Sequence, residues 1–138
     1  MKILAAIDQS EYAVLVIRKA VELAGREGAD ITAMTVTSAQ FNNLYQADSL
    51  ADILQKLRDG IQETLSQAGV TNDGVKVVAA ENPSPADAIV RYAEDNGVDL
   101  IVIGNKGSGA IERFLIGSVS SQVVAHAPCS VLVVKKQQ

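Results

Sequence analysis

The sequence alternates between short apolar runs and longer stretches with helical periodicity, and this alternation is what most constrains the fold. Continuous apolar runs of about five residues are typical of strands that are buried on both faces. Because a helical stretch separates each run from the next, the strands are expected to be parallel, with helices on both faces of the sheet. The expected strands are Ile3–Ile7, Ile31–Val36, Leu100–Ile103, Val131–Val134 and a weaker one at Val75–Ala80.

Four stretches between these runs have the spacing and the end signals of helices. Ser10 is a candidate N-cap of the first helix, and Gly25 and Gly28 mark its end. Ser84 and Pro85 are typical of the start of the third helix. The helices are expected near 10–28, 48–68, 84–97 and 117–128, and the second should bury a face made of Leu50, Ile53, Leu54, Leu57, Ile61 and Leu65.

This order of elements predicts a three-layer α/β/α fold built on a five-stranded parallel sheet. The 138 residues fit a single domain, residues 1–138. Asn42–Ala47 carries neither pattern and is expected to be a loop.

Charge and composition exclude several classes of function. The formal net charge of −4 repels phosphate backbones, and scarce aromatic residues argue against stacking platforms, so we expect no nucleic-acid binding. No apolar run approaches the ~18 residues of a membrane span. Met1 and Lys2 lead directly into the first strand, and Cys129 is the single cysteine. We therefore expect no signal peptide, no disulfide and a cytoplasmic location.

Glycines cluster directly after the fourth strand in the chain. Gly104, Gly107 and Gly109 allow close approach of the backbone to a ligand, and successive N–H groups in such a turn form a concave anion site. Gly117 and Ser118 then place free N–H groups at the start of the last helix, where the helix dipole also favours an anion. Two such signals, separated by a short connector, indicate a polyphosphate held between them.

The spacing alone leaves an alternative open, because glycines after a strand can form only a turn and Ser118 can act only as a cap. The segment is not a Walker loop, and it lacks the last glycine of a dinucleotide fingerprint. No nucleophile–base pair and no cluster of metal ligands can be assembled, so we predict neither catalytic nor metal-binding residues. His126 and Cys129 are expected to be structural.

The glycine spacing resembles that of a known family. Gly104-x-x-Gly107, nine residues, and then Gly117-Ser118 is similar to the Gly-2x-Gly-9x-Gly-Ser/Thr motif in the ATP-binding branch of the universal stress proteins. The segment Asp99–Lys135 resembles the C-terminal half of that family, and Ile3–Ser10, with Asp8 after the first strand, resembles its start.

The resemblance implies an adenine nucleotide alpha hydrolase-like, Rossmann-like fold with strand order 3-2-1-4-5, which places Asp8 beside the Gly104 loop. It implies bound ATP, with Mg²⁺ held through the phosphates. Lys106 and Arg113 are open candidates for phosphate contact. The nucleotide-binding residues that it implies are Ala6, Asp8, Val36, Ile103, Gly104, Gly107, Gly117, Ser118, Val119 and Ser120.

The function implied by the resemblance is that of an ATP-binding module in stress response or signalling. Such a module would act as a homodimer, joined through the apolar edge strand Val131–Val134. Two alternatives remain at this point: slow ATP hydrolysis at the same site, and a relative of the same fold that binds AMP or a flavin.

Overall fold

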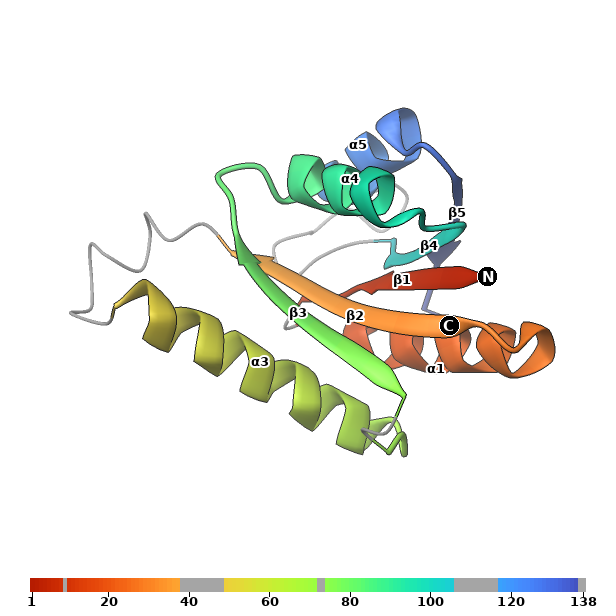
Figure 1. Ribbon diagram of the computed structural model, residues 1–138, viewed down its shortest axis with the longest axis horizontal. Helices are drawn as coiled ribbons and strands as arrows, with labels where there is room; N and C mark the ends of the chain where they lie inside the picture. The colour runs from red at the N-terminus through yellow and green to blue at the C-terminus, as the bar shows by residue number, and fades with distance from the viewer. Residues whose placement is uncertain (9, 38–48, 72–73, 106–116, 137–138) are drawn as a thin grey trace.

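A five-stranded parallel sheet lies between two layers of helices (Figure 1). The computed structural model describes residues 1–8, 10–37, 49–71, 74–105 and 117–136. The sheet has the order β3-β2-β1-β4-β5, which confirms the expected fold and strand order. The elements are β1 (Lys2–Ala6), α1 (Tyr12–Glu27), β2 (Asp30–Thr37), α3 (Leu50–Gln67), β3 (Val75–Glu81), α4 (Pro85–Asn96), β4 (Leu100–Gly104), α5 (Ser118–His126) and β5 (Ser130–Val134).

The central strand β1 pairs with β2 on one side and with β4 on the other. The chain leaves β1 toward β2 and β3, and later returns to the opposite side of β1 to form β4 and β5. This reversal is the topological switch point of the sheet, where doubly wound folds bind ligands at the carboxyl ends of the strands. Ala6 and Ile103 are partners in the register, so β1 and β4 end side by side.

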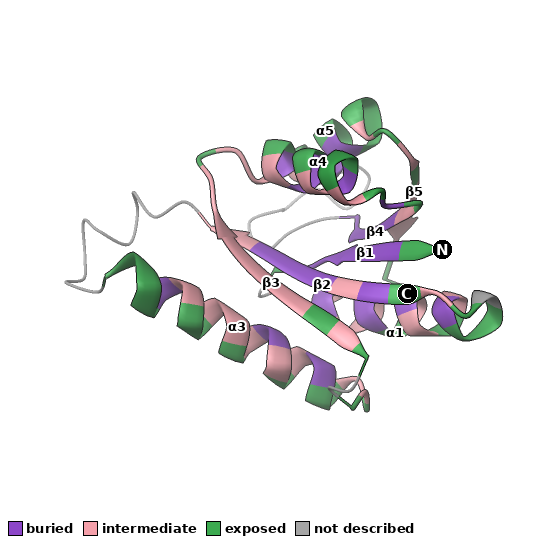
Figure 2. Cartoon of the chain, viewed as in Figure 1, coloured by how far each residue is buried: buried purple, intermediate pink, exposed green. Residues whose placement is uncertain are grey.

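The strands are buried on both faces because alternate side chains enter two separate cores. Ile3, Ala5 and Val102 pack with α1 and α3 in one core, whereas Leu4 and Ile101 pack with α4 and α5 in the other. Figure 2 shows β1 largely buried and the edge strand β3 only partly so. This double burial explains why the strands have continuous apolar runs in the sequence.

The ends of α1 correct the sequence-based expectation in two details. The helix begins at Tyr12 with Glu11 as its N-cap, while the Ser10 hydroxyl accepts a bond from the Tyr12 N–H at 3.2 Å. Gly25 lies inside the helix, and Gly28 ends it in the left-handed conformation at φ +63°. Only glycine adopts that conformation without strain, which is why Gly28 stops the helix.

The starts of α3 and α4 are stabilised by serine caps. Ser84 accepts a bond from the Asp87 N–H at 3.3 Å, as expected from the Ser-Pro pair, and Ser49 accepts one from the Asp52 N–H. The expected apolar face of α3 is wrong at its first residue, because Leu50 is 47 % exposed. The expected loop Asn42–Ala47 lies outside the described residues. None of the helices that the structure describes could cross a membrane.

Candidate functional site

The end of β1 is fixed by hydrogen bonds to β2 and within the following turn. The Ile7 N–H donates to the Met34 carbonyl at 2.9 Å, and the buried Thr35 hydroxyl donates to the Ile7 carbonyl at 3.1 Å. Directly after Ile7, the exposed Asp8 carboxylate accepts a bond from the Ser10 N–H at 2.8 Å. Asp8 is therefore held at the carboxyl edge of the sheet by its own turn.

The end of β4 is tied to β5 and to the start of α5 through one residue. The Asn105 N–H donates to the Val134 carbonyl at 2.8 Å, and the Asn105 carbonyl accepts from the Gly117 N–H at 2.7 Å. Asn105 itself is 6 % exposed, and its side-chain oxygen has no hydrogen-bond partner among the residues that the structure describes. These bonds place the N-terminus of α5 directly beside the carboxyl end of β4.

The first turn of α5 presents N–H groups that the helix does not use. Gly117 is its N-cap, with extended backbone angles, and the first bond back to the Gly117 carbonyl comes from the Ser121 N–H at 2.9 Å. The N–H groups of Ser118, Val119 and Ser120 therefore have no acceptor within the helix. Together with the helix dipole they favour an anion at this point of the sheet edge.

The Ser120 hydroxyl has a structural partner. It donates to the Gly104 carbonyl, and the Ser120 side chain is only 4 % exposed. This bond clamps the first turn of α5 onto the last residue of β4. The contribution that Ser120 can make to an anion is thus its backbone N–H.

Gly104 is required by packing against α1. A Cβ atom at this position would lie 2.9 Å from the Tyr12 Cβ and 3.2 Å from its Cγ. The sequence predicted that this glycine lets a ligand approach the backbone; the structure shows that it lets the first turn of α1 approach β4. The absence of a side chain therefore brings the start of α1 and the end of β4 together.

An ion pair links β5 to the start of α1 at the same edge. Lys136 Nζ lies 2.8 Å from Glu11 Oε2, and both side chains are exposed. The hydrogen bond that Lys136 donates to Glu11, together with the negative charge of Glu11, raises the pKa of Lys136. This ion pair ties the segment after β5 to the residue that caps α1.

Most of the expected site residues meet at this edge. Asp8, Gly104, Gly117, Ser118, Val119 and Ser120 lie around the ends of β1 and β4. Ala6 ends β1 and Ile103 is the second-last residue of β4, but each is 6 % exposed and packs in the core beneath α4 and α5. Val36 lies one strand away, near the end of β2. Gly107, Lys106 and Arg113 lie outside the described residues.

Comparison with known proteins decides the family. The model of the universal stress protein family matches residues 1–135. SH1215 of Staphylococcus haemolyticus, which is named for that family, is 36 % identical over 99 % of this chain and 85 % of its own length. The chain belongs to the universal stress protein family. The universal stress protein UspA from Lactobacillus plantarum is 28 % identical, with a TM-score of 0.75 and 97 % of each chain covered.

A more distant universal stress protein, solved in complex with cAMP, shares the fold. Its TM-score is 0.71 at 21 % identity, and the likeness covers 97 % of this chain and 96 % of the other. The sheet of this universal stress protein is doubly wound, with its switch point between β1 and β4.

Sequence reasoning missed three residues whose packing and hydrogen bonds hold this edge of the universal stress protein together. Tyr12 sets the requirement for glycine at 104, and Asn105 bridges β5 and α5 through its backbone. Thr35 supplies the hydroxyl that ties β2 to the end of β1. A polar residue within or just after an apolar run was the available signal for Thr35 and Asn105. Tyr12 left none, because its contact spans 92 residues of chain.

Proposed function

We propose that this universal stress protein binds ATP at the carboxyl edge of β1 and β4 and serves as a nucleotide-dependent module in the cytoplasmic stress response. One observation carries the proposal: the Asn105–Gly117 hydrogen bond holds three N–H groups of α5, which have no acceptor within the helix, beside the end of β4. A phosphate group fits such donors, because the helix start holds them in place and the helix dipole favours an anion there.

Each site residue then has a specific role. The N–H groups of Ser118, Val119 and Ser120 bind phosphate oxygens, and the Asp8 carboxylate faces the nucleoside from β1. The Met34 carbonyl of β2 points toward β1, where it accepts the bond from Ile7. Val36 lies two residues further along β2, so its backbone groups point to the same side. Because β1 has ended at that level, we propose that these groups bind adenine. Ala6 and Ile103 form the apolar floor beneath this edge.

A divalent cation would be held through the nucleotide. Among the described residues, no group of three or more His, Cys, Asp or Glu side chains is placed to hold a metal ion. Mg²⁺ usually keeps several waters and binds through phosphates with few protein ligands. We therefore propose that Mg²⁺ enters with ATP and is bound by the phosphate oxygens.

The comparisons support the ligand class. A universal stress protein of the same fold was solved in complex with cAMP, which, like ATP, is an adenine nucleotide. That likeness is one of fold, so the assignment to this chain depends on the geometry of the α5 N-terminus.

The sharpest test removes one backbone donor without disturbing the helix. Proline is tolerated at the first helical position, and the extended backbone of Gly117 suits a residue that precedes proline. Ser118→Pro should keep the fold and weaken ATP-Mg affinity about tenfold or more, measured by calorimetry on protein stripped of nucleotide.

Leu50→Pro is the matched control, since Leu50 is the exposed first residue of α3 after an extended N-cap. It should leave ATP affinity unchanged. Ser118→Ala removes the hydroxyl but keeps the N–H group, so it should weaken ATP binding less than Ser118→Pro does.

Wild-type protein at a hundredfold excess of ATP over the dissociation constant should gain about 2.7 kcal/mol of stability. Equal ATP affinity in wild type and Ser118→Pro would refute the proposed phosphate contact.

We further propose that two copies join through β5. This strand forms one edge of the sheet and carries apolar residues on both faces. The Val134 carbonyl accepts a bond from the β4 side, so the backbone groups of Val133 point to the free edge. Val133→Pro removes the N–H that faces outward, together with a side chain that packs beneath α4 and α5, so Val133→Ala is the control for the lost side chain. Sedimentation should show a dimer for wild type and a monomer for the variant; a monomeric wild type would exclude this interface.

A further inference from the structure

A hollow opens at the opposite end of the strands from the proposed nucleotide site. It has a volume of about 460 Å³, within the range of roughly 300–1,000 Å³ that is usual for small-molecule pockets. Its walls are the first residues of β1, β2 and β3 and the last turns of α4. It exists because α4 packs on β2, while β3 at the sheet edge is covered by α3 on its other face.

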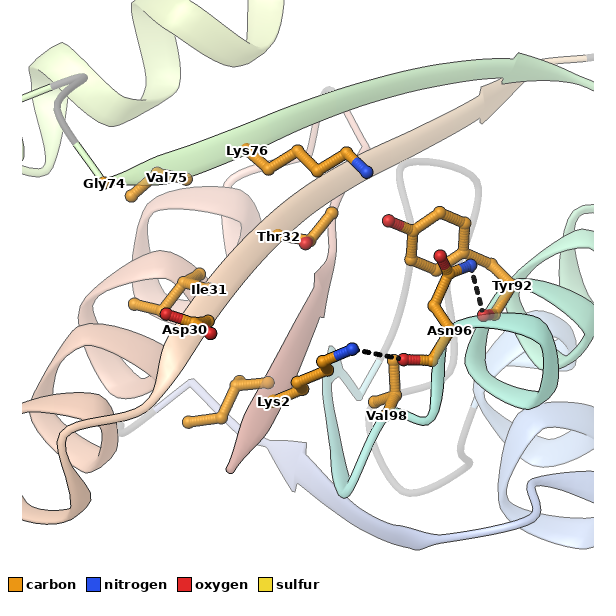
Figure 3. A pocket seen from close by; sticks show the side chains of 11 residues that line it. Lys2, Asp30, Ile31, Thr32, Gly74, Val75, Lys76, Tyr92, Asn96 and Val98 are labelled. Carbon is orange, nitrogen blue, oxygen red and sulfur yellow. Dashed lines mark hydrogen bonds between the residues drawn. The ribbon is translucent and has the colours of Figure 1, made fainter.

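Three polar groups line this hollow, and one of them, Lys76, is exposed. Thr32 and Lys76 are neighbours in the register of β2 and β3, and they lie on the face that carries α4. Figure 3 shows the Lys76 ammonium group and the Tyr92 hydroxyl turned toward the same space, with the Thr32 side chain beside them. In the part of the chain that the structure describes, none of the three forms a hydrogen bond or an ion pair.

The second lysine of the hollow has a structural partner. Lys2 Nζ donates to the Asn96 carbonyl at 3.1 Å, at the C-terminal end of α4, where the helix dipole favours a cation. The charge of Lys76 has no such partner. With Asp30 also at the rim, two lysines and one aspartate leave the lining with an excess positive charge, in a chain whose net charge is −4.

We infer that this hollow is a second binding site, for a small organic molecule that carries an oxyanion, either a phosphate ester or a carboxylate. The Lys76 ammonium group pairs with the oxyanion, and the hydroxyls of Thr32 and Tyr92 donate hydrogen bonds to it. The Tyr92 ring and the apolar floor, which includes Val98, cover the carbon skeleton of the ligand. The volume exceeds what a bare oxyanion requires, which favours an organic ligand.

The inference is independent of ATP binding at the carboxyl edge. The five residues of β1 separate the two ends of the sheet by about 13–17 Å at ~3.3 Å per residue. The carboxyl edge offers backbone N–H groups, whereas the hollow offers side chains. The two sites can therefore be removed one at a time.

Amide-resolved NMR titration tests the inference, with glycerol 3-phosphate and succinate as probes and sodium chloride as the ionic-strength control. Saturable shifts at Thr32, Lys76 and Tyr92, with Gly104 and Gly117 unmoved, are expected for at least one probe. The probe that saturates distinguishes a phosphate source from a carboxylate source. Lys76→Gln should weaken its binding about tenfold or more, and Thr32→Val should weaken it less.

Arg18→Gln is the matched control, because it removes one exposed positive charge from α1, outside the hollow. It should leave the binding constant unchanged. The spectra themselves show whether each variant is folded. Shifts that do not saturate, shifts confined to the carboxyl edge, or equal weakening by Lys76→Gln and Arg18→Gln would each overturn the inference.

Discussion

The two ends of the same parallel strands are built from different chemistry. At the carboxyl ends of β1 and β4, the donors without an acceptor in the helix are backbone N–H groups of α5, and the Ser120 hydroxyl is engaged by the Gly104 carbonyl. At the amino ends of β2 and β3, the donors are side chains, namely those of Lys76, Thr32 and Tyr92. A site made of backbone needs glycines at fixed spacing, whereas a site made of side chains needs only the right neighbours across strands.

The difference explains which site left a pattern in the sequence. Gly104 and Gly117–Ser118 stand out because close backbone packing and a helix start restrict residue type along one stretch of chain. Thr32 and Lys76 are 44 positions apart in the numbering and become neighbours only through the register of β2 and β3. Such a pair has no spacing that a single sequence can reveal.

The largest effect on stability is expected at the carboxyl end of β4, where Gly104 packs against Tyr12. Gly104→Ala places a Cβ 2.9 Å from the Tyr12 Cβ, so the two elements have to move apart. We expect the free energy of unfolding in urea to fall by about 1–3 kcal/mol. Gly25→Ala in α1 is the control: a Cβ there meets nothing within 4 Å, and it should stabilise the helix by about 0.5–1 kcal/mol. Equal effects would mean that packing does not explain the glycine at 104.

A smaller loss of stability is expected when the hydrogen bond between the Ser120 hydroxyl and the Gly104 carbonyl is removed. Ser120→Ala removes the buried bond to the Gly104 carbonyl and should cost about 1 kcal/mol of stability. ATP-Mg affinity should fall with it, because the first turn of α5 loses its anchor. Ser121→Ala, at the neighbouring exposed position, should change neither quantity. If Ser120→Ala lowers affinity without lowering stability, the hydroxyl contacts the ligand directly.

The smallest expected effect is on the pH dependence of stability, through Cys129 at the amino end of β5. Burial, with a further contribution from the Asp99 carboxylate, raises the pKa of the Cys129 thiol. The folded protein therefore binds the thiol proton more tightly than the unfolded chain. This contribution to stability is complete below the ordinary thiol pKa and is lost as pH rises through the folded value.

The rate of thiol alkylation against pH checks this prediction. Its midpoint should be higher in the native protein than in urea-unfolded protein, and Asp99→Asn should move the native midpoint part of the way down. A native midpoint equal to or below the unfolded one would show that burial does not control this thiol.

The sequence predicted the layers, the strands and most helix ends, because double burial and positive-φ glycines such as Gly28 and Gly97 restrict residue type locally. The family resemblance supplied the strand order. The details that were wrong or missed depend on distant contacts. Leu50 fits the helical period but lies beyond the reach of the core, and the hydroxyl of Ser120 is engaged by a carbonyl 16 positions away.

ATP-Mg titration of nucleotide-free protein, followed residue by residue through amide NMR, tests the central claim most directly. The account predicts saturable shifts at Asp8, Gly104 and Gly117–Ser120, with Thr32, Lys76 and Tyr92 unmoved. Saturation confined to the amino-end hollow, or no saturable shift at either end at millimolar ATP, would contradict it.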